Sequence, residues 1–177
     1  MVLSRRWRMV VIIGLLALSG CGEPAHWREV VFTPVAAYND MLGITNTHYR
    51  GAAVLVVLAS TADEKQQIES LLPVALKGTI RELPLEQQVL IAVFQGEKYS
   101  SGYGVEIMRI VDRQPGVYIY ARFATPQRGQ LQEGGTRSPV AVVSVERSAL
   151  PTGQPISIHL LDSATGQEVL VLEYIVD

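Results

Sequence analysis

Cysteine is almost absent from this chain of 177 residues, because Cys21 is the only one. A single cysteine cannot form a disulfide within the chain, so the stability of the folded part has to come from a buried core. Hydrophobic residues make up 48% of the sequence, which is close to the globular average and enough to build such a core. The length indicates one ordinary domain and leaves too few residues for two.

Histidine is scarce as well. His26, His48 and His159 are far apart in the sequence, and neither a His-x-x-x-His pattern nor a cysteine pair is present. We therefore predict no metal site and no cofactor. Serine, histidine and aspartate all occur, but no serine lies in a Gly-x-Ser-x-Gly nucleophile turn. The sequence thus favours no catalytic residue and does not indicate an enzyme.

The chain has few charged residues, and its N-terminal segment carries basic residues without any acid. Charged residues make up 18% of the chain, and its formal net charge is −2. Residues 1–20 hold three arginines and no acid, so the rest of the chain has 15 − 3 = 12 basic and 17 acidic residues, a net charge of 12 − 17 = −5. A negative domain does not attract nucleic-acid phosphates or anionic lipid head groups. We therefore expect no nucleic-acid partner, and attachment to a membrane requires another feature.

The N-terminus has the pattern of an export signal. Arginines precede an apolar run from Met9 to Leu18, which is too short for a stable membrane span. Such a run is typical of a secretory signal peptide, which we assign to residues 1–20. The pair Arg5-Arg6 also suggests a twin-arginine signal, but Arg8 stands where such signals usually have phenylalanine, so general secretion is favoured.

The last residues of this segment, Leu18-Ser19-Gly20-Cys21, resemble the lipobox of bacterial lipoproteins. In proteins with this motif the cysteine thiol takes a diacylglycerol, and cleavage leaves the cysteine as the new N-terminus. We therefore expect lipidation at Cys21 and a place in a bacterial cell envelope, lipid-anchored on the extracytoplasmic side. The alternatives are an ordinary signal peptide with an incidental cysteine and an uncleaved anchor.

Beyond a tether and connecting segment over residues 21–48, residues 49–177 are predicted to form a single α+β domain. Short apolar or alternating runs are separated by turn residues such as Pro115-Gly116 and the segment 162–166. The pattern predicts a mostly antiparallel β-sheet that curls into a small barrel or sandwich, with one packed helix. The expected strands cover residues 27–32, 52–59, 88–95, 103–111, 117–123, 139–146, 156–161 and 168–176.

One helix of about three turns is predicted after the strand at 52–59. Thr61 and Glu64 have the spacing of a capping box, which marks a helix start. Pro73 predicts that the helix ends near Leu72. The residues that follow, 76–88, are predicted to be turn-like. Four apolar residues have the spacing of one helical face: Ile68, Leu71, Leu72 and Ala75.

The most organised stretch of the chain runs from Val89 to Val111. An apolar run, a polar segment punctuated by glycines and an alternating run follow one another, which predicts a strand, a loop and a strand. Either the glycines only shape a tight connection, or the loop brings backbone N–H groups and its tyrosine to a partner peptide or a small ligand. The candidate binding residues of this loop are Gly96, Lys98, Ser100, Gly102 and Tyr103.

This stretch resembles the PrcB C-terminal domain family, named for a subunit of a bacterial surface protease complex. In that family a strand ends in glycine, a basic residue follows two positions later, and Thr/Ser-Gly-Gly-Tyr opens the next strand. Here those positions hold Gly96, Lys98 and the segment Ser100-Ser101-Gly102-Tyr103. A Thr-Pro pair and a Ser-Pro pair before a valine-rich strand also match in order, so the resemblance covers residues 88–147.

Ser101 departs from the family pattern, because it replaces the first glycine of a Gly-Gly pair. If that position requires a positive φ angle, serine is strained where glycine is not. The resemblance implies a non-catalytic accessory or protein-interaction module, with an exported protease or another envelope protein as its partner. The alternatives are a periplasmic domain that binds a small ligand or an envelope polymer, and a hydrolase whose site has no recognisable pattern.

Tyr118 and Tyr120 lie on one face of the strand expected at 117–123 and offer a second candidate partner surface. The other interpretation is that they are half-buried strand aromatics, which are common.

Overall fold

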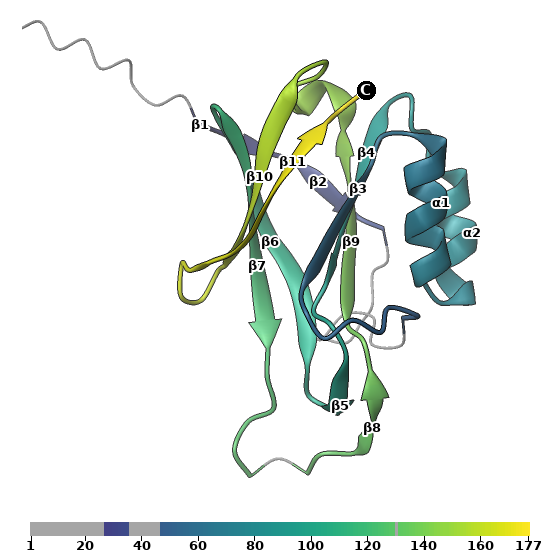
Figure 1. Ribbon diagram of the computed structural model, residues 1–177, viewed down its shortest axis with the longest axis vertical. Coiled ribbons are helices and arrows are strands. Elements are labelled where there is room, and N and C mark those ends of the chain that lie inside the picture. The colour runs from purple at the N-terminus through teal and green to yellow at the C-terminus, as the bar shows by residue number, and fades with distance from the viewer. Residues whose placement is uncertain (1–26, 36–46, 130) are drawn as a thin grey trace, which may run out of the picture.

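The computed structural model of the protein describes residues 27–35, 47–129 and 131–177. They form two β-sheets packed face to face, with two helices against the outer side of the smaller sheet (Figure 1). The predicted β-rich sandwich is therefore confirmed, and the described strands do not close into a barrel. The predicted signal peptide and Cys21 lie outside the described residues.

The larger sheet has the strand order β1-β6-β7-β10-β11. Its neighbours are antiparallel except for β7 and β10, which are parallel because the chain crosses to the other sheet between them. The sheet is therefore mixed. Its strands are β1 (Trp27–Val30), β6 (Gly104–Arg113), β7 (Gly116–Ala124), β10 (Pro155–Asp162) and β11 (Glu168–Ile175).

The smaller sheet is fully antiparallel, with the order β2-β9-β4-β3. Its strands are β2 (Phe32–Pro34), β3 (Leu55–Ala59), β4 (Gln88–Phe94) and β9 (Val140–Glu146). A separate ribbon pairs β5 (Lys98–Ser100) with β8 (Gly134–Arg137), and a 3-10 turn, η1 (Arg147–Ala149), follows β9. Strand β8 lies between the strands expected at 117–123 and 139–146, where the sequence analysis predicts no strand.

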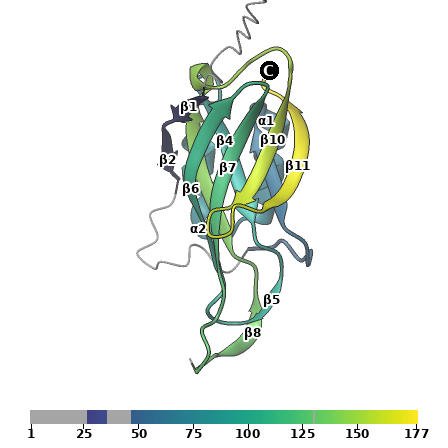
Figure 2. The same cartoon turned by 90° about the vertical axis from the view of Figure 1, so that its left-hand side faces the viewer.

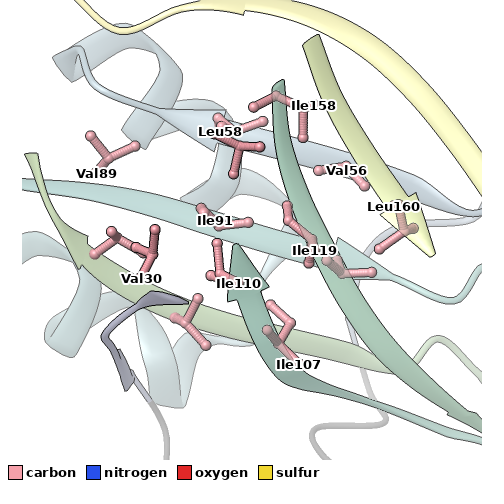
Figure 3. Close-up of a cluster of buried hydrophobic side chains, with 14 of the residues drawn as sticks. Val30, Val56, Leu58, Val89, Ile91, Ile107, Ile110, Ile119, Ile158 and Leu160 are labelled. Carbon is pink, nitrogen blue, oxygen red and sulfur yellow. The ribbon is translucent and has the colours of Figure 1, made fainter. Parts of the chain in front are cut away.

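Strand β4 is buried on both faces, which explains its continuous apolar sequence. Val89, Ile91 and Val93 point into the core between the two sheets. The alternate residues of the strand pack against the helices on the other side. In Figure 3, Ile91 lies among side chains that come from both sheets, such as Ile119 and Leu58. Strand β3 divides its side chains between the same two clusters, as its sequence predicts.

The helix α1 (Ala62–Leu71) begins and ends where the sequence predicts. Thr61 is its N-cap, and the reciprocal capping box with Glu64 is present. The buried Ile68 and Leu72 face the smaller sheet. The fourth residue of the predicted face, Ala75, is exposed and lies in a second helix instead.

The prediction of a single helix is wrong, because α2 (Val74–Glu82) occupies much of the segment expected to be turn-like. Pro73 ends one helix and serves as the N-cap residue of the next. Leu76 and Ile80, one turn apart, are buried against the smaller sheet and stabilise α2. Gly78 lies within α2 without interrupting it, and nothing lies within 4 Å of the position that a Cβ atom would occupy there.

The described residues of the expected tether and connecting segment take part in the sandwich. Strand β1 pairs with β6, and β2 pairs with β9 in the other sheet. The buried Val30 adds to the core between the sheets (Figure 3). Residues 27–34 therefore connect an edge of one sheet to an edge of the other.

Candidate functional site

The candidate loop lies at one end of the sandwich, where β5 and β8 project beyond the two sheets (Figures 1 and 2). We refer to residues 98–103 and 131–137 as the β5–β8 tip. Two paired strands hold its shape: Lys98 lies opposite Arg137, and Ser100 lies opposite Gly134. The C-terminus lies at the other end of the molecule (Figure 1).

Gly96 is buried at the base of the tip and is not part of its surface. Its φ angle is +86°, and a Cβ atom here would lie 2.5 Å from the carbonyl oxygen of Ala52. The next residue, Glu97, donates its backbone N–H to the carbonyl of Gly51 at 2.8 Å. Gly96 therefore allows a close backbone approach that fastens the tip to the segment before β3.

The strain considered for Ser101 does not arise, because every described residue with a positive φ angle is a glycine. The left-handed position is Gly102, at +89°, where a Cβ atom would crowd Pro126 at 3.2 Å. Ser101 donates its N–H to the carbonyl of Glu133 at 2.9 Å, and its Oγ accepts the Glu133 N–H at 2.9 Å. The serine therefore adds a hydrogen bond that glycine cannot make.

Lys98 and Tyr103 come together on the tip. The Lys98 Nζ lies 5.7 Å from the centre of the Tyr103 ring, within the range of a cation–π contact. Both side chains are half-buried, as are Ser100 and Gly102. Four of the five candidate residues therefore lie at the surface of the tip, and Gly96 lies beneath them.

The most exposed apolar side chains of the tip are two that the sequence analysis did not select. Tyr99 is 75% exposed, and Leu131 is completely exposed. Because strand side chains alternate, Tyr99 points away from the side of β5 that carries Lys98 and Ser100. The sequence could have indicated Tyr99, because it lies between two selected residues, Lys98 and Ser100. Leu131 lies in a segment whose fold depends on pairing with β5.

The base of the tip is tied to both sheets. Gln95, at the end of β4, donates its backbone N–H to the carbonyl of Pro139 at 2.9 Å. Its buried side chain donates from Nε2 to the carbonyl of Ala124, at the end of β7, at 3.1 Å. Thr47 also donates its hydroxyl to the carbonyl of Ser138 at 2.9 Å. These bonds fix the tip relative to the sandwich.

A second polar cluster joins Ser60, Glu64 and Tyr174 at the start of α1. The Tyr174 hydroxyl donates to Glu64 Oε2 at 2.7 Å and accepts the Ser60 N–H at 3.0 Å. Burial opposes ionisation of Glu64, but hydrogen bonds from Tyr174, Ser60 and Thr61 outweigh it and lower the pKa of Glu64. Burial, aided by the Glu64 carboxylate, raises the pKa of Tyr174 to about 12. The cluster fastens β11 to α1, which is a structural role.

This cluster predicts a dependence of stability on pH. Because the folded-state pKa of Glu64 is lowered, the folded state binds fewer protons than the unfolded state, and stability falls as the pH drops below about 4.5. In Glu64→Gln this part of the acid destabilisation is absent, and stability at pH 7 is lower by about 1–3 kcal/mol. Urea unfolding at pH 7, 5, 4 and 3 measures both effects.

The control for this experiment is Asp63→Asn, a change in an exposed acid of the same helical turn. We expect it to leave the acid dependence of stability close to that of the parent protein. An unchanged pH slope in Glu64→Gln would contradict the role assigned to the carboxylate.

Tyr118 and Tyr120 are half-buried on the outer face of the larger sheet. The Tyr118 ring stacks on His159 with 4.4 Å between ring centres, and the His159 Nδ1 lies 2.7 Å from Glu168 Oε2. The Arg109 guanidinium lies 5.1 Å from the centre of the Tyr120 ring. These contacts account for both tyrosines as half-buried strand aromatics.

Several further features bear on chemistry. Among the described residues, no group of three or more His, Cys, Asp and Glu side chains converges as a metal site would require. One shallow hollow lies beside Glu146 and Arg147, and another lies where Lys65 of α1 faces Leu83 after α2. Both are lined by residues outside the tip.

No described helix has the length and apolar character needed to cross a membrane.

The architecture defines a two-sheet β-sandwich with helices on one side and a projecting two-stranded tip. Residues 89–146 match the family model described as PrcB C-terminal, so this segment is similar to that family, and the resemblance seen in the sequence is confirmed. The matched segment runs from β4 to β9 and includes the whole tip. Comparisons with curated proteins and with solved structures found no match.

Proposed function

We propose that this protein is a non-catalytic, lipid-anchored accessory module of a bacterial cell envelope, which binds another exported protein through the β5–β8 tip. The observation that carries the proposal is the exposure of Tyr99 and Leu131 on a tip whose backbone is held by hydrogen bonds. Apolar and aromatic side chains that project from a fixed backbone are favoured at protein interfaces, because little conformational entropy is lost on binding.

The similarity to the PrcB C-terminal family supports this proposal, since the matched segment contains the tip. An exported protease, or another protein of the same envelope, is therefore the partner we expect. The partner's identity rests on this similarity, whereas the binding surface rests on the geometry of the tip.

The direction of the tip also fits an anchored module. Trp27, at the start of the described fold, pairs with Arg113 at one end of β6, and the tip lies beyond Gly104 at the other end. Strand β6 has 10 residues, which corresponds to roughly 30 Å of extended chain. A lipid at Cys21 would therefore hold the module from the end opposite the tip and present the tip away from the membrane.

The test is capture of the partner by the full-length protein from detergent-solubilised envelopes, followed by direct binding of the two purified proteins. We expect near-stoichiometric recovery of one envelope protein. Replacing Tyr99 and Leu131 together by serine should reduce its affinity at least about tenfold. Stability should change by no more than about 0.5 kcal/mol, because both side chains are exposed.

The matched control replaces Val31 and Val74 by serine, since both are as exposed as Tyr99 but lie outside the tip. Recovery should be unchanged in this variant. If the tip variant recovered as much partner as the parent protein, the tip would not be the binding surface. If the parent protein recovered no envelope protein, the accessory role would be contradicted. Tip-dependent binding of an envelope polymer without a protein would support the polymer-binding alternative instead.

The proposed lipid anchor at Cys21 is tested by separating the membrane and soluble fractions of the same cells. In Cys21→Ala the protein should leave the membrane fraction, because the thiol that takes the lipid is gone. A protein that stays in the membrane fraction would contradict lipidation at Cys21.

A further inference from the structure

The two sheets end in four edge strands, β1, β11, β2 and β3, and three of them are poorly suited to pairing with another chain. Strand β1 has four residues, among them the charged Arg28 and Glu29. Strand β2 has three residues and ends in Pro34. Strand β3 has five residues, four of which are buried. Short length, charge and proline are the features by which natural sheets protect their edges.

Strand β11 differs from these three. It has eight residues with two glutamates but no lysine, arginine or proline, and within the described structure it pairs on one side only, with β10. Val169, Val171 and Ile175 are 39%, 44% and 45% exposed along it. Figure 2 shows β11 at one edge of the larger sheet, beside β10. A long apolar edge of this kind is a template for the addition of another strand.

We propose that β11 pairs antiparallel with β11 of a second copy of this chain, which joins the larger sheets of the two copies into one continuous sheet. With the twofold axis at Leu172, Leu170 lies opposite the partner's Tyr174, and Val171 lies opposite the partner's Glu173. No two acids face each other in this register. The half-buried Leu170 and Leu172 pack against the core between the sheets, so the pairing extends the cores of both copies.

Charge restricts the register of this pairing. A shift of the axis to Glu173 would set this residue opposite its own copy, and like charges directly opposite each other are unfavourable. The axis is therefore confined to the apolar run 169–172. This strand lies outside residues 89–146, so the dimer does not depend on the similarity to the PrcB C-terminal family or on the tip.

Disulfide formation between single cysteines tests this pairing. Cys21 is the only cysteine, so a Cys21→Ala background has none. Leu170, Val171, Leu172 and Glu173 are each replaced by cysteine in the full-length chain. Only the residue at the axis lies opposite its own copy, with Cα atoms about 5 Å apart, which suits a disulfide. One position away, the two residues are displaced by roughly 7 Å along the strands.

We expect Leu172→Cys to form the linked dimer at least about tenfold faster under mild oxidation than Met108→Cys. Met108, 48% exposed on β6, is the control for an accessible thiol away from the edge. A single maximum at Leu170 or Val171 would also support the pairing, with its axis moved along the strand. Rates equal to that of Met108→Cys at all four positions would overturn it.

A second measurement does not depend on oxidation. Sedimentation velocity of the full-length Cys21→Ala chain should show a dimer that dissociates on dilution. Val171→Glu should be monomeric with an unchanged circular dichroism spectrum, because the new acid would lie opposite the partner's Glu173. Met108→Glu should remain dimeric. A monomeric parent chain, or a β11 cysteine that links to a different envelope protein, would overturn the proposal. Because Tyr99 and Leu131 lie outside β11, their serine variants should still dimerise, which separates this test from that of the tip.

Discussion

Replacing Gly96 with alanine is expected to lower the free energy of unfolding by about 3 kcal/mol or more. Two causes add together. The φ angle of +86° disfavours any residue with a Cβ atom by about 1–2 kcal/mol. The new methyl group would also lie 2.5 Å from the Ala52 carbonyl oxygen, which is backbone and cannot rotate away.

The matched control is Gly166→Ala. Gly166 has a φ angle of +71°, but nothing lies within 4 Å of the position that its Cβ atom would occupy. We expect a loss of about 1–2 kcal/mol there, from backbone strain alone. Urea unfolding followed by circular dichroism measures both variants, and equal losses would show that the contact with Ala52 has no energetic consequence.

Truncation of Ile91 to alanine is expected to reduce stability by about 2–5 kcal/mol, because the side chain is fully buried between the two sheets and its removal leaves a cavity. Phe94→Ala acts on the opposite face of the same strand, and we expect a loss of about 3–5 kcal/mol there. The two variants together test whether β4 supports both cores.

The control for this pair is Met108→Ala, an exposed position on β6, which should change stability by no more than about 0.5 kcal/mol. The midpoint of urea unfolding and its slope separate stability from a change in the unfolded state. If either Ile91→Ala or Phe94→Ala behaved like the control, β4 would be buried on one face only.

The binding residues of the tip could be predicted only in part. The glycines and Lys98 stand out in sequence because glycine punctuates a short polar segment between two strands. Tyr99 could have been selected as well, because it lies between Lys98 and Ser100 in the same segment. Leu131 does not stand out, because it lies just before β8, a strand that forms only by pairing with β5. That pairing joins residues 34 to 39 positions apart (134 − 100 and 137 − 98), and no local pattern in the sequence records it.

Elements whose signals are local can be predicted from the amino-acid sequence alone. Continuous apolar runs predict strands that are buried on both faces, and alternating runs predict strands with one solvent-exposed face. The capping box at Thr61 predicts the start of α1. The length of the chain indicates one domain, and the single cysteine means that its stability has to come from a hydrophobic core. Each of these follows from chemistry within a few neighbouring residues.

The remaining features depend on contacts that form only in the folded chain. Strand β10 lies parallel to β7, α2 forms because Leu76 and Ile80 find the smaller sheet, and β11 is left as an unprotected edge. Ser101 is unstrained because Glu133 comes to pair with it from the other side of the tip. All of these depend on contacts between distant segments, whose free energy exists only once the chain has folded.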